Sequence, residues 1–225
     1  MSGSFPVVPG FKSMMVSLQQ KVHQSVSGLG KVQTRVLGAQ LTVVSVNFPP
    51  MTREEFAPVD AFMMRQRGRD ESFTLVMPDK ATPLGGVSGA PVLYDDYPAG
   101  TDTIVLDAMV PSVVKAFAAS DIINFGGYTK VHTVAFDADS QANNTRVLED
   151  GTVRLLEDGS DRLMEDANTV TLTISPPLYK ALNKGVSVNY NNVAYTMKFK
   201  TDSMSVDISA PRFYSRQVEM IEYIS

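Results

Sequence analysis

The sequence predicts a mainly β protein with minor α content, in which a small β-barrel or sandwich is inserted into an outer β-barrel-like or sandwich-like domain. Short runs of alternating apolar and polar residues recur along the chain, Gly- and Pro-containing turns separate them, and one segment combines helical periodicity with a matching cap. The length of 225 residues with 44% hydrophobic content permits one large domain or two small ones.

The first well-defined strand lies within residues 31–48. Val44, Val46 and Phe48 alternate with polar residues, which is the period of a half-buried strand. The first thirty residues mix small, polar and apolar types with Pro and Gly. We expect them to form an arm or loop rather than core.

A helix is expected directly after this strand. Thr52 and Glu55 form a capping box, and Gly68 supplies the C-terminal stop. Pro58 would remove a helical hydrogen bond, so either the helix kinks there or a short turn precedes a helix that restarts near Pro58. Residues 72–77 then predict a second strand.

A loop rich in Pro and Gly at residues 83–100 marks the first domain boundary. Many short strands with turns between them follow, which favours a small barrel or sandwich. One small helix is expected around residues 178–183. The strand-like runs are residues 103–106, 121–125, 130–136, 169–174, 186–190 and 193–199.

The C-terminal part returns to strand patterns, with alternation through Met204, Val206 and Ile208 and a further run at residues 217–224. We expect this tail to pair with the N-terminal strands. The predicted outer domain therefore comprises residues 1–83 plus 197–225, and the inserted domain comprises residues 84–196.

Composition excludes several function classes. The chain has 20 Lys and Arg against 24 Asp and Glu, so we expect neither specific nucleic-acid binding nor a membrane partner. The absence of Cys excludes disulfides and thiolate chemistry. No apolar run reaches the roughly 20 residues of a membrane-spanning helix, and no secretion signal is visible, so we expect a soluble, cytosolic protein at first.

An internal repeat occupies residues 146–167, where RVLEDGTV, RLLEDGSD and RLMEDANT follow one another with a period of eight. Each unit has too few apolar residues to build a solenoid core, so the repeat is interpreted as a surface loop. Its acidic pairs do not match the spacing of a helix–loop–helix calcium site. A contact between this loop and a neighbouring subunit stays open.

No motif supports catalysis. Residues 86–90 resemble a hydrolase elbow but end in Ala90, and residues 28–31 lack most of a phosphate-binding loop. His132 has no partner at ligand spacing and is interpreted as structural. We therefore expect no enzyme activity, no catalytic, cofactor-binding or metal-binding residues, and no cofactor.

The order of several segments resembles the distal tail protein family of long-tailed bacteriophages that infect Gram-negative hosts. The resemblance covers nearly the whole chain from about Lys31, and the family usually has Gly-Asp where this chain has Ser120-Asp121. The repeat at residues 146–167 is outside the family pattern. The segments are VNFPPMTREEFAPVDAFMMRQRGR, TDTIVLD, SDIINFGGYTKVHTV, TVTLTISPPLYKAL and VAYTMKF.

This resemblance implies a structural virion protein that is assembled in the host cytoplasm. Subunits of the family form a hexameric ring, each with a ring domain and an inserted barrel of the oligonucleotide-binding (OB) type. The implied partners are further copies of the chain, the tail tube protein, baseplate hub or tip proteins, and tail fibres. The ring would line the channel through which DNA leaves.

Two alternatives stay open at this stage. A baseplate or tail-completion protein of a contractile-tailed phage could use the same ring. A carbohydrate-binding module that attaches the particle to its host is the alternative from another class. Such modules expose aromatic platforms, and a chain with no Trp and 8 Tyr gives this alternative little support.

Overall fold

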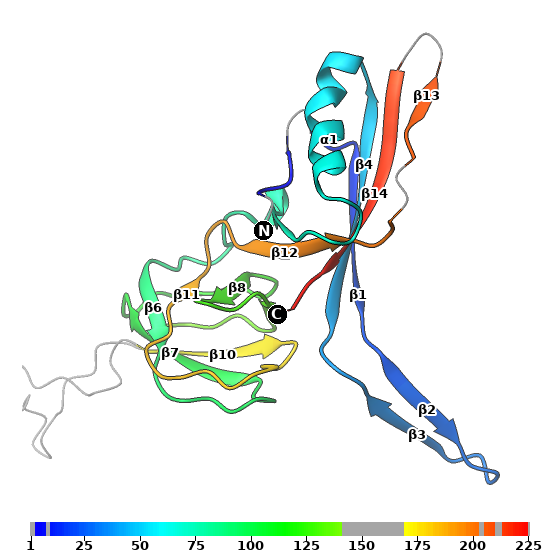
Figure 1. Cartoon of the computed structure of the whole chain (residues 1–225). Helices are drawn as coiled ribbons and strands as arrows, with labels where there is room; N and C mark the ends of the chain where they lie inside the picture. The colour runs from blue at the N-terminus through cyan, green and yellow to red at the C-terminus, as the bar shows by residue number, and fades with distance from the viewer. Residues whose placement is uncertain (1–2, 8–9, 141–168, 203–204, 210–212, 225) are drawn as a thin grey trace, which may run out of the picture. The chain divides into compact units, whose positions relative to one another are not determined.

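The computed structural model is mainly β, with one α-helix and a nearly closed, six-stranded, barrel-like sheet (Figure 1). The chain divides into unit 1, Met1–Val76 with Ala194–Ser225, and unit 2, Met77–Val193. Both ends of the chain belong to unit 1, and the divisions lie three to seven residues before the expected ones. No helix among the described residues is long and apolar enough to cross a membrane. The structure describes residues 3–7, 10–140, 169–202, 205–209 and 213–224.

Unit 1 is built on an antiparallel sheet with the order β1-β4-β14-β12-β5, and a short strand, β13, also pairs with β14. The C-terminal strand β14 lies against β4, so the expected return of the tail to the N-terminal strands is confirmed. The strands are β1 (Ser13–Gln19), β4 (Leu41–Met51), β5 (Phe73–Val76), β12 (Ala194–Phe199), β13 (Asp207–Ser209) and β14 (Phe213–Glu222).

Helix α1 (Arg53–Arg65) buries its apolar stripe in unit 1. The predicted capping box is present, since the Glu55 amide donates to Thr52 and the Glu55 carboxylate accepts from the Thr52 amide. The helix is continuous through Pro58, so the alternative in which a second helix restarts near Pro58 is wrong. Val44, Val46 and Phe48 of β4 are buried as their alternation predicts.

The N-terminal segment contributes to the core of unit 1, so the prediction of an arm outside the core is wrong. Phe5 is buried, and its ring lies 5.7 Å from the ring of Phe73 and 5.6 Å from that of Phe62. The backbone around Phe5 also pairs with β5 at Thr74. A single aromatic residue among Pro and Gly gives no periodicity, which is why the pattern missed this contact.

The segment between β1 and β4 forms a hairpin of β2 (Val22–Val26) and β3 (Val32–Val36), so this part of the chain lies outside the core as expected but is a paired ribbon rather than a loop. It extends beyond the ends of β1 and β4 (Figure 1). Every residue from 21 to 38 is exposed. The alternation was present in the sequence, but without burial it forms a ribbon rather than core.

Unit 2 contains the barrel-like sheet, with the order β11-β8-β9-β10-β7-β6. Backbone bonds from Leu93 to Val186 and from Gly185 to Leu93 join β6 to the segment that leads into β11, which nearly closes the barrel. The strands are β6 (Gly89–Leu93), β7 (Thr103–Met109), β8 (Ile122–Phe125), β9 (Val131–Val134), β10 (Val170–Ser175) and β11 (Val188–Asn189).

The inward side chains of these strands, such as Ile104, Leu106, Phe125 and Leu172, form the core of unit 2. Two local predictions are wrong here. Residues 178–183 form no helix, because Leu182 instead bridges to Tyr97. Strand β6 was read as loop because its Gly and Pro content is atypical of strands.

Candidate functional site

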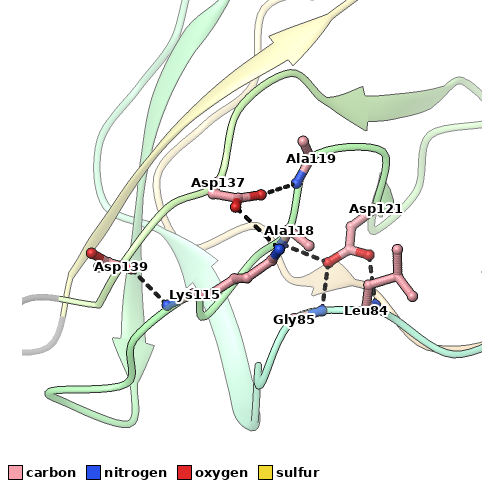
Figure 2. A network of polar contacts seen from close by, with 8 residues as sticks. All are labelled: Leu84, Gly85, Lys115, Ala118, Ala119, Asp121, Asp137 and Asp139. Atoms are coloured by element: carbon pink, nitrogen blue, oxygen red, sulfur yellow. Dashed lines mark hydrogen bonds and ion pairs between the residues drawn. The ribbon is translucent and has the colours of Figure 1, made fainter.

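The most connected polar group of unit 2 is the carboxylate of Asp121, which is 4% exposed. It accepts hydrogen bonds from the amides of Leu84, at 2.7 Å, Gly85, at 3.1 Å, and Ala118, at 2.8 Å (Figure 2). Gly85 lies so close to residues 116–117 that a Cβ there would be 2.4 Å from the Ala116 carbonyl oxygen. Asp121 therefore links the loop that follows η1 (Pro78–Lys80) to the segment at residues 115–119.

Two exposed carboxylates continue this network along the same segment (Figure 2). Asp137 accepts from the Ala119 amide at 2.7 Å and forms an ion pair with Lys115 at 3.1 Å. Asp139 accepts from the Lys115 amide at 2.6 Å. The Ala119 amide, and then Lys115, hold the pKa of Asp137 below its usual value. These carboxylates act as acceptors for loop amides.

This geometry does not resemble a reaction centre. A shallow cleft of about 130 Å³ borders Asp121, but each oxygen of that carboxylate already accepts from backbone amides. His132 is buried, and its Nδ1 lies 2.7 Å from the Pro176 carbonyl oxygen. Among the described residues, no group of three potential ligands could hold a metal ion.

The other motifs discussed in the sequence analysis do not form a common site among the described residues. Residues 28–31 form the turn of the β2–β3 hairpin, and residues 86–90 lead into β6 without a following helix. Ser120 has a φ of 78°, a conformation that favours glycine. The octad repeat at residues 146–167 lies outside the described residues.

The strongest candidate surface is the β2–β3 hairpin, which sequence reasoning missed. Its register places four valines on one side of the ribbon, with the polar pair Gln24 and Thr34 between them, and we call the four valines the valine face. Each of these side chains is 49–62% exposed. These exposures show that no described part of the chain covers this face. An isolated two-stranded hairpin is only marginally stable in water. The valine face comprises Val22, Val26, Val32 and Val36.

The opposite side of the hairpin is cationic. His23 lies directly across from Arg35, and the register continues outward to Lys21 at the base and Lys31 at the turn. We call these four residues the cationic face. The alternation of valines with basic residues from 21 to 36 was the signal that could have predicted a two-sided ribbon.

The edge strands of the unit 1 sheet differ in whether another described segment pairs with them. The N-terminal segment covers the outer side of β5, since the Phe5 amide donates to Thr74 O at 2.7 Å and Thr74 N donates to Gly3 O at 3.0 Å. No described strand covers the outer sides of β1 and β13. Strand β1 contains no charged residue or proline, and its Met15 and Leu18 are 70% and 63% exposed. Natural proteins usually protect such edges against pairing.

No protein-family model matches the chain, and a search of curated proteins finds no match either.

Proposed function

We propose that the protein is a structural subunit of a bacteriophage tail, which forms a distal tail or baseplate hub ring between the tail tube and the tip. The ring would be a hexamer, would line the DNA exit channel, and would contact tail tube and hub proteins and tail fibres in the virion. The resemblance described above suggests the biological setting. The observation that carries the proposal is the pair of open sheet borders in unit 1.

Strand directions make these two borders complementary. Strand β1 is antiparallel to β4, β4 to β14, and β14 to β13, so β13 runs opposite to β1. When two copies stand side by side in the same orientation, β13 of one copy can pair with β1 of the next as an ordinary antiparallel ladder. Such a head-to-tail interface leaves a free border at each end and closes into a ring if the rotation permits.

The two borders lie at different levels of the sheet. Strand β1 pairs with residues 41–47 of β4, whereas β13 pairs with β14 beside Tyr214, which faces Met51. Each added copy would therefore be displaced along the strand direction. Closed barrels require tilted strands with this kind of stagger, so the offset is compatible with a ring.

The valine face supplies the apolar surface that such an interface needs. It continues the side of the sheet that α1 covers, because Val16 and Val22 follow the same alternation as the buried Val44. Complete burial of one valine is worth about 1.5 kcal/mol or more, so four valines can offset a substantial part of the cost of association.

The mass of the purified protein, measured by light scattering, with negative-stain imaging of large species, tests the proposal. We expect rings of about six copies for the wild type and for the control Met64→Lys, which adds a charge at a 68% exposed position of α1. Leu18→Lys should give monomers, because a lysine on an edge strand opposes pairing. A wild type that stays monomeric at every concentration, or equal assembly of both variants, would contradict the proposal.

A further inference from the structure

We propose that the cationic face of the β2–β3 hairpin binds the phosphate backbone of double-stranded nucleic acid without sequence preference. The inference rests on the proposed function, because a tail ring is what brings DNA to this surface. It assigns the two sides of the hairpin to different partners. The valine face packs on a neighbouring copy, and the cationic face meets the DNA.

The first argument is the distribution of charge. The first 53 residues contain five Lys or Arg and no Asp or Glu, whereas the remaining residues contain 15 Lys or Arg and 24 Asp or Glu. The first 53 residues therefore have a net charge of +5 because they contain no acidic residue, whereas the remaining residues have a net charge of −9. A local patch of this kind sets the local field even when the whole protein is acidic.

The second argument is that the basic residues of the hairpin have no ion pair with a described residue. The ion pairs at Arg69, Lys115 and Lys200 lie elsewhere in the described chain. The charge of this side comes from Lys21, Lys31 and Arg35, and His23 lies directly opposite Arg35. An anionic partner would supply the counter-charge of these three residues, which indicates a ligand rich in negative charge.

The third argument is shape. A two-stranded β-ribbon fits the major groove of B-DNA, and Ser, Gln, Lys and Arg side chains are common donors to phosphate oxygens. Ser25 and Gln33 lie on the same side as Lys21, Lys31 and Arg35. Residues 21–37 contain no aromatic side chain. Stacking on single-stranded bases requires aromatics, so duplex backbone is the better match.

Fluorescence anisotropy with a labelled duplex of arbitrary sequence tests the inference on the full chain, over a series of salt concentrations. Three phosphate contacts, from Lys21, Lys31 and Arg35, predict an affinity that falls about 40-fold between 50 and 200 mM salt. The double variant Lys31→Ala/Arg35→Ala should lower affinity about tenfold or more at 50 mM salt and reduce the salt slope by about two. The control Lys180→Ala/Lys184→Ala removes two exposed charges from unit 2 and should bind like the wild type.

Ring assembly is measured on the same samples, so the two proposals can fail separately. Rings that do not bind the duplex at 50 mM salt would overturn this inference and leave the proposed function standing. Equal loss of binding in both double variants would overturn it as well. Tighter binding of poly-glutamate than of DNA, at equal total charge, would also overturn it and would assign the cationic face to an acidic protein surface.

Discussion

The two units of this protein differ in how far each completes its own structure. In unit 2 the sheet nearly closes on itself, and a buried carboxylate satisfies three loop amides. In unit 1 no described strand covers two borders of the sheet, and an 18-residue stretch around the hairpin is exposed throughout. The comparison shows that unit 1 presents exposed strands with apolar side chains, whereas unit 2 presents exposed loops whose amides are bound by its own carboxylates.

Removing the hairpin should have the largest effect, because it should prevent assembly while leaving the stability of the monomer unchanged. Replacing residues 22–36 by Gly-Gly, between Lys21 and Leu37, should abolish ring formation, with an association constant reduced more than about 100-fold. The free energy of unfolding of the monomer should change by no more than about 0.5 kcal/mol, because every residue of the hairpin is exposed in the described chain. Light scattering and urea unfolding followed by circular dichroism measure the two quantities.

A second variant sharpens this prediction by keeping the ribbon. Converting all four residues of the valine face to Thr preserves strand propensity and removes most of the apolar character. It should also prevent ring formation if apolar burial drives the contact. Rings in the Thr variant, or a large loss of monomer stability on removal of the hairpin, would contradict the distinction between the two units.

Asp121→Ala should be the most damaging single substitution in the polar network of unit 2. It leaves three amides without their acceptor, one of them on the buried Ala118, and should lower the free energy of unfolding by about 3 kcal/mol. The matched control Asp139→Ala removes one acceptor at an exposed position and should cost about 1 kcal/mol or less. Equal urea midpoints for these two variants would show that the Asp121 network does not hold the loop.

The smallest expected effect is the pH dependence that Asp137 contributes. Its pKa is lowered in the folded state, so its charge stabilises unit 2 above its unfolded pKa of about 3.9, and this contribution is lost as the pH falls through the folded pKa. Asp137→Asn keeps an acceptor for Ala119 and removes the charge. Its urea midpoint should lie below that of the wild type at pH 7 and converge with it below about pH 3. A constant difference across this range would contradict the assignment.

Local chemistry explains the parts of the fold that the sequence predicts well. Val44, Val46 and Phe48 alternate because α1 covers one side of β4, and Thr52 with Glu55 marks the start of that helix. The six strand runs expected between residues 103 and 199 coincide with strands of the structure, some with the alternation of a half-buried strand, as in β10, and some as short apolar runs between turns, as in β8. These signals are local, so one sequence suffices to find them.

The missed features depend on tertiary contacts. Phe5 joins the core because β5 offers an edge to the N-terminal segment, and no local pattern records that pairing. The same holds for Asp121, whose acceptor role depends on amides that lie more than 30 residues away in Leu84 and Gly85. The hairpin was missed for another reason, since its valines are apolar without being buried.

The most direct test of the central claim is thiol cross-linking between copies. The natural chain has no Cys, so Leu18→Cys in β1 and Ile208→Cys in β13 would introduce the only thiols. With a short bifunctional maleimide, the double variant should give a ladder of covalent multimers that ends at the ring, while each single variant should give no covalent multimers on a denaturing gel. A double variant that gives no ladder, or single variants that dimerise equally well, would contradict a head-to-tail contact between β13 and β1 of successive copies.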